Sequence, residues 1–132
     1  MRTHILSVII IASIPIFNAG CSQQVSFNAD VQPILTASCL KCHDGSGEGS
    51  ETSGFNVKDY DSLMKGTQFG PVVVAGDSVS STLFRMISHQ ADKKIQMPPH
   101  HDVSLAEGRG DPLSAAQIET IKTWIDQGAK NN

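Results

Sequence analysis

Two cysteines and a histidine at a fixed spacing are the residues of this chain best suited to chemistry. Cys39 and Cys42 are separated by two residues, and His43 follows at once. This spacing is the attachment pattern of a c-type haem. Each thiol can form a thioether with one vinyl group of the same porphyrin, and the next side chain then lies under the iron. The segment therefore predicts one covalently bound haem c, with His43 as the proximal ligand of its iron.

A Cys-x-x-Cys pair also occurs in half of a zinc site, in a redox dithiol and in a structural disulfide. A structural zinc site takes four Cys or His ligands, and the chain has no second Cys-x-x-Cys pair and no His pair at zinc spacing. A thioredoxin-like dithiol has a βαβ context, and no alternation of strand and helix surrounds Cys39. Haem attachment is the favoured interpretation.

The sixth position of the iron decides whether a haem transfers electrons or binds small molecules. Met97 is the predicted distal ligand, because Pro98 and Pro99 follow it, stiffen the backbone and remove competing amide donors. A methionine within a helix is more often core filler than ligand. The remaining candidates are Met64, Met86, His89, His100 and His101. A bis-histidine haem through His100 or His101, which would have a much lower potential, and an open site stay as alternatives.

Residues 1–20 are predicted to be a secretion signal. A continuous apolar run at residues 5–17 follows a short start that contains Arg2. The run is too short to span a bilayer comfortably and contains Pro15, so a permanent transmembrane anchor is the weaker interpretation. We therefore expect an exported protein in the periplasm or cell envelope.

Cys21 is the one cysteine outside the haem motif. With Ala19 and Gly20 before it, Cys21 resembles the cysteine of a bacterial lipobox, although Asn18 stands where that pattern prefers leucine. We expect a lipid on Cys21 that anchors the protein to a membrane. Ordinary cleavage near Ala19 or Gly20, which leaves a soluble periplasmic protein, is the alternative.

Length and charge restrict the class of the mature domain. The 132 residues predict one small domain at 27–132 behind a short linker at 21–26. Removal of residues 1–20 takes away one base, Arg2, and no acid, so the net charge of −3 becomes −4. An acidic chain lacks the basic field that nucleic-acid binding requires, so we expect no nucleic-acid partner.

The haem motif requires a helix that ends at Cys39. A helix is expected from Asn28, a good N-cap, to about Ser38 or Leu40. Residues 44–54 are rich in Gly and Ser without apolar periodicity and predict a plain surface loop. Further helices are expected over 59–65, from Asp77 or Ser78 to Ser88, and after Ser114, with an extended segment at 70–76.

The last helix has the clearest signals. Ser114 and Gln117 form a capping box, and Leu113 and Ile118 occupy the positions of a hydrophobic staple. An apolar stripe at helical spacing includes Trp124, which is interpreted as a packing residue rather than an electron relay.

Residues 27–129 resemble a class I monohaem cytochrome c, and most closely the planctomycete-type cytochrome c domain of bacterial exported proteins. The matching segments are Asp30–Leu35, Cys39–His43, Gly76–Asp77 with Ser81 and Leu83, Met97–Pro99 and Ser114–Ala129. Two departures are Ala75, where the family often has proline, and a longer link at 100–111. The resemblance implies an all-α, small cytochrome c fold with about four helices around one covalently attached haem.

The resemblance also implies that the first and last helices cross and that the Met97 loop covers the haem face opposite His43. A backbone carbonyl would orient His43 through its ring N–H, and Pro71 is the candidate for that carbonyl.

The expected function is that of an exported monohaem c-type cytochrome that transfers single electrons between redox partners. It would be an electron carrier rather than an enzyme, alone or as the electron-transfer subunit of an oxidoreductase complex. The alternative is a haem-based sensor or ligand-binding protein with an open or displaceable sixth position. Lys41, Lys93 and Lys94 are candidates to steer an acidic partner, or are a solvated lysine face.

Overall fold

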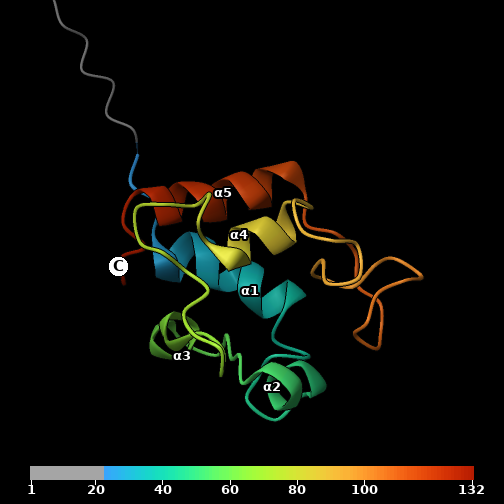
Figure 1. Cartoon of the computed structure of the whole chain (residues 1–132). Coiled ribbons are helices and arrows are strands. Elements are labelled where there is room, and N and C mark those ends of the chain that lie inside the picture. The colour runs from blue at the N-terminus through green and yellow to red at the C-terminus, as the bar shows by residue number, and fades with distance from the viewer. Residues whose placement is uncertain (1–22) are drawn as a thin grey trace, which may run out of the picture.

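The computed structural model describes residues 23–132, and every regular element in that range is a helix (Figure 1). An isolated bridge joins Thr67 and Gly70, and no strand forms within residues 23–132. The all-α prediction is confirmed, with five α-helices where about four were expected. The elements are the π-helical turn η1 (Phe27–Val31), α1 (Gln32–Ser38), α2 (Glu48–Ser53), α3 (Tyr60–Lys65), α4 (Thr82–Ile87) and α5 (Ala115–Asp126).

The first helical segment is capped by Ser26, so the predicted N-cap at Asn28 is wrong. The Ser26 hydroxyl accepts a hydrogen bond from the Ala29 N–H at 3.2 Å, and the Asp30 carboxylate accepts one from the Ser26 N–H at 2.8 Å. These two bonds satisfy otherwise unpaired amides of the first turn. The Asn28 side chain instead donates to the carbonyl of Asn132 at 3.1 Å, which joins the two ends of the described chain.

Residues 48–53 form helix α2, so the prediction of a plain loop over 44–54 is wrong there. The Asp44 carboxylate accepts hydrogen bonds from the N–H groups of Ser46 at 2.8 Å and Gly47 at 2.7 Å, which shapes the turn before the helix. Gly54 then ends it with a φ of 74°, a conformation that favours glycine. The residues at its two ends therefore determine this helix. Its sequence has no apolar stripe at helical spacing, so hydrophobic periodicity does not predict it.

Helix α3 confirms the expected short helix, whereas α4 begins later than predicted. Asp59 caps α3 by accepting from the Ser62 N–H at 2.8 Å. Asp77 accepts from the Ser80 N–H at 3.0 Å, so its carboxylate closes a turn before α4 rather than capping the helix. The buried Ser81 hydroxyl accepts from the Val74 N–H at 2.8 Å, and α4 therefore starts at Thr82.

Helix α5 confirms the predicted capping box, because Ser114 and Gln117 bond each other's backbone amides. Its buried face packs against η1 and α4 (Figure 1). The rings of Trp124, Phe27 and Tyr60 contact one another: the Trp124 centroid lies 5.4 Å from that of Phe27 and 6.4 Å from that of Tyr60, and the latter two are 5.2 Å apart. The first and last helical segments therefore meet through an aromatic cluster, in keeping with the packing role expected of Trp124.

Residues 89–111 form a long irregular loop that projects from the helices (Figure 1). Hydrogen bonds from the Leu105 N–H to the Lys94 carbonyl at 2.8 Å and from the Gly110 N–H to the Pro99 carbonyl at 3.0 Å fold the loop back on itself. None of the helices within residues 23–132 has the length and apolarity needed to cross a membrane. The predicted signal at 1–20 and Cys21 lie outside the described residues.

Candidate haem site

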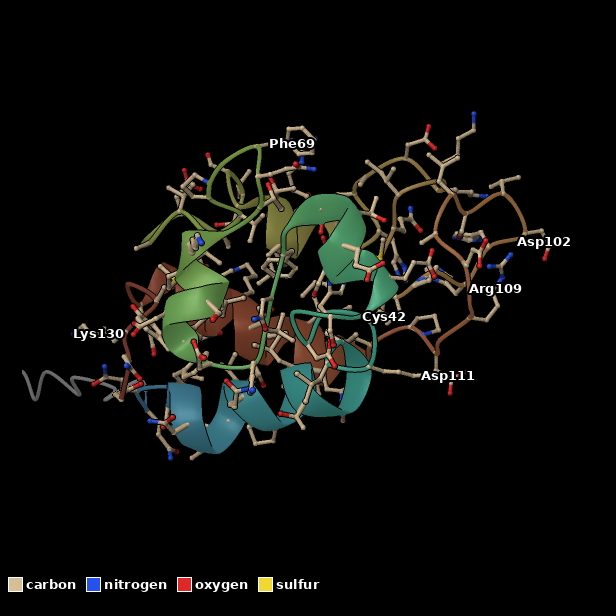
Figure 2. All side chains as sticks on the ribbon, turned by 90° about the horizontal axis from the view of Figure 1, so that it is seen from below. Cys42, Phe69, Asp102, Arg109, Asp111 and Lys130 are labelled. Atoms are coloured by element: carbon tan, nitrogen blue, oxygen red, sulfur yellow. The ribbon has the colours of Figure 1, made fainter. Side chains whose placement is uncertain are left out.

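The haem motif continues α1 by one tight turn. Cys39 is the C-cap of α1, and its N–H donates to the Leu35 carbonyl at 2.9 Å. The Cys39 carbonyl then accepts from the N–H groups of Cys42 at 3.1 Å and His43 at 3.0 Å. Figure 2 shows Cys42 at the turn between α1 and α2, on the side from which the loop bearing Asp102 and Arg109 projects. The backbone thus brings both thiols and the imidazole together.

Cys39 and Cys42 are free, partly buried thiols. Burial, together with the neighbouring Cys42 sulfur, raises the pKa of the Cys39 thiol to about 11. Redox-active dithiols and metal-binding thiolates have lowered pKa values, because they act as thiolates. Cys39 is instead a protonated thiol on the edge of the apolar core, which fits covalent attachment of an apolar porphyrin better than dithiol exchange.

The surroundings of His43 favour its neutral imidazole form. Burial lowers its pKa, and the backbone of Phe55 offsets part of that shift. The Phe55 ring packs edge-on against the imidazole, with centroids 5.2 Å apart. The Nδ1 atom of His43 is shielded from solvent and makes no hydrogen bond of good geometry, although the Phe55 backbone lies close enough to act on the ring. A neutral imidazole is the form that binds a metal. The role expected of the Pro71 carbonyl stays a prediction.

Two glycines within the segment predicted to be a plain loop shape the surroundings of this motif. A Cβ atom on Gly49 would lie 2.5 Å from Cε1 of His43 and 2.8 Å from each ring nitrogen. A Cβ atom on Gly47 would lie 2.8 Å from the Cys42 carbonyl oxygen. Helix α2 can therefore pack against the imidazole only through glycine. The sequence shows where these glycines lie, but it does not show that Gly47 approaches the Cys42 backbone and Gly49 the His43 ring.

Replacement of Gly49 by alanine is expected to destabilise the haem-loaded protein by about 1–3 kcal/mol, because the new methyl group overlaps the His43 ring. Inside a helix, replacing glycine by alanine usually increases the stability of the protein by about 0.5–1 kcal/mol. Chemical unfolding measures the sign, and the g-values of the ferric haem report the orientation of the imidazole. Thr52→Ala, on an exposed position of the same helix, is the matched control. A stabilised Gly49→Ala protein would show that α2 does not rest on His43.

Met97 lies partly buried on the projecting loop, between the buried residues Gln96 and Pro98. Its N–H donates to the Met86 carbonyl of α4 at 3.4 Å. The same loop reaches α2, where the Glu107 N–H donates to the Glu48 carboxylate at 3.4 Å. The loop that holds Met97 and the helix that packs on His43 therefore contact each other. The other methionine candidates, Met64 and Met86, are partly buried, and Met64 packs against the hydrophobic core.

The rings of the three candidate histidines lie next to one another, tilted by 41° and 42° between neighbours. The ring centroids of His89 and His100 are 4.8 Å apart, and those of His100 and His101 are 4.1 Å apart. His100 and His101 also bond polar groups of the loop itself, at Pro98 and Gln96. Within residues 23–132, no group of three or more His, Cys, Asp or Glu side chains is arranged to hold a metal ion.

Comparison with known families identifies the domain. Residues 39–101 match the family model described as Planctomycete cytochrome C. Residues 39–101 are a planctomycete cytochrome c domain. The match begins at Cys39 and ends at His101, so it includes the haem motif and Met97 and leaves α1 and α5 outside. Neither a curated protein nor a solved structure matches the chain significantly.

Membership in this family implies covalent haem c and haem-based electron transfer, and cytochromes c are typically electron carriers rather than enzymes. The residues of this cytochrome c domain fit such a group. Cys39 and Cys42 occupy the Cys-x-x-Cys-His motif as free thiols. Burial lowers the pKa of His43 and so favours the neutral imidazole that an axial ligand requires.

Proposed function

We propose that this protein is an exported monohaem c-type cytochrome that passes single electrons between redox proteins. The observation that supports this best is the placement of His43, a partly buried imidazole whose pKa is lowered by burial and which directly follows two free thiols in the turn after α1. In the proposal, Cys39 and Cys42 hold the porphyrin, and His43 and Met97 are the proximal and distal ligands of the iron.

The bound haem would supply one-electron exchange at its iron, while the chain sets access and ligand geometry. The Cys39 thiol lies on the edge of the core, so a porphyrin attached there would lie close to apolar side chains. Helix α2 restricts movement of His43 through the close approach of Gly49. The loop that holds Met97 contacts Glu48 of α2 through its residue Glu107, and it would exclude water from the distal face of the haem.

Electron donors and acceptors would dock where the haem edge is reachable. Lys41, Lys93 and Lys94 are exposed, and the last two lie on the loop that holds Met97. Transient redox contacts are small, and an acidic partner surface would be drawn to these lysines. We therefore propose acidic redox proteins as partners.

Met97→Leu is the test of the distal ligand. In the haem-loaded parent we expect a six-coordinate ferric iron with a methionine-to-iron charge-transfer band, and in the variant we expect that band to be lost. Optical spectroscopy and redox titration measure both, and Met64→Leu is the control that keeps the band. A parent protein with a high-spin, five-coordinate iron that binds carbon monoxide rapidly would contradict electron transfer and favour a haem-based sensor.

We also propose that the protein is anchored to a membrane of the cell envelope through a lipid on Cys21, behind a signal at residues 1–20. Fractionation of cells is expected to place the parent protein with membranes and Cys21→Ser in the soluble fraction. Because Cys21 lies outside the haem motif, the variant should retain its haem. A parent protein found in the soluble fraction would contradict the anchor.

A further inference from the structure

A methionine ligand depends on the loop that holds it. A thioether is uncharged and binds iron weakly, so its bond is maintained only if the backbone keeps the sulfur in place. Met97 lies on an irregular loop, and its own N–H makes only a long bond of 3.4 Å to the Met86 carbonyl. Other groups must therefore hold this segment, and the residue before Met97 is the best placed to do so.

Gln96 is a buried amide, only 4% exposed, with its hydrogen bonds on two sides of the loop. Its Nε2 donates to the Ala91 carbonyl at 2.8 Å and to the His89 carbonyl at 3.3 Å, both in the turn that follows α4. Its Oε1 lies 2.9 Å from Nε2 of His101. The side chain thus links the segment before Met97 to the segment after it.

These contacts determine which atoms of Gln96 and His101 donate hydrogen bonds and which accept them. The two carbonyl oxygens can only accept, so the amide nitrogen of Gln96 must face them and its oxygen must face His101. An amide oxygen also only accepts, so Nε2 of His101 is the donor. The imidazole of His101 is itself held by the ring of His100, whose centroid is 4.1 Å away, and Nδ1 of His100 bonds the Pro98 carbonyl at 2.6 Å.

The structure assigns Gln96 as a positioning residue for Met97, with His101 as the donor that completes its hydrogen bonds. The inference rests on the proposed function, because it takes Met97 as the distal ligand. Gln96 and His101 do not touch the iron in this scheme. They limit the freedom of the loop, and so they disfavour the state in which the sulfur has left the iron.

Binding of imidazole to the haem-loaded ferric protein measures this effect, because imidazole must displace Met97. We expect Gln96→Leu, which removes the amide at similar volume, to bind imidazole about tenfold more tightly than the parent. His101→Phe keeps a ring but removes the donor, and it should bind imidazole more tightly as well. His101→Gln retains an N–H that can reach Oε1, so we expect affinity close to that of the parent.

Ser81→Ala is the matched control. Ser81 is also a buried polar residue bonded to backbone, at Val74 and Asp77, but it lies before α4 and away from Met97. The Ser81→Ala substitution should lower the stability of the protein and leave its affinity for imidazole unchanged.

The outcomes separate the two hypotheses. A parent protein without the methionine-to-iron band overturns the proposed function, and this inference with it. A parent with the band, together with Gln96→Leu or His101→Phe proteins of unchanged imidazole affinity, overturns this inference alone. His101 is only partly buried, so His101→Phe keeps the test available if Gln96→Leu does not fold.

Discussion

When Cys39 and Cys42 are both replaced by serine, the protein is expected to carry no haem after denaturing gel electrophoresis. Serine cannot form the thioether bonds, so any porphyrin that still enters the site would be held only by its iron ligands and by apolar contact. Peroxidase staining of haem after gel electrophoresis should be strong for the parent and absent for the double variant. The effect is all or none, because a covalent bond survives denaturation and a coordinate bond does not.

Single replacements of a cysteine by serine are the controls for this result. Cys39→Ser and Cys42→Ser alone each leave one thiol, so each should retain stain through a single thioether. Cys21→Ser leaves the motif intact and should stain like the parent. Covalent haem in the double variant would show that the porphyrin is attached elsewhere.

The parts of the fold that the sequence predicted are those with local signals. The capping box of Ser114 and Gln117 acts within one turn, and the spacing from Cys39 to His43 is set by the chemistry of a single porphyrin. Neither depends on residues far along the chain. Both could therefore be recognised before any contact was known.

The errors arose where a distant partner decides the outcome. Ser26 and Asn28 are both good N-caps, and both side chains also bond the distant Asn132, a contact that the local sequence does not reveal. Gly49 gave no distinctive local signal, because its role depends on the approach of α2 to His43. The buried amide of Gln96 was missed for the same reason, since a glutamine in a polar loop is usually exposed.

Trp124 is expected to be the most important single side chain for stability. It is 1% exposed and packs against both Phe27 and Tyr60, and its indole N–H donates to the Lys130 carbonyl at 2.9 Å. Trp124→Ala would leave a large cavity where η1 meets α5, and it would leave the Lys130 carbonyl without its donor. Such a change typically costs about 3–5 kcal/mol.

That loss is a large share of the roughly 5–15 kcal/mol that stabilises a small domain. Guanidinium unfolding of the haem-loaded proteins should therefore place the midpoint of Trp124→Ala far below that of the parent. Phe69→Ala removes an aromatic ring of a residue that is 86% exposed, and we expect a change within about 0.5 kcal/mol. Because η1 leads directly into α1, and α1 ends at Cys39, the aromatic cluster also anchors the helix that presents the haem motif. A Trp124→Ala protein as stable as Phe69→Ala would mean that the covalent haem, and not this cluster, holds the first and last helical segments together.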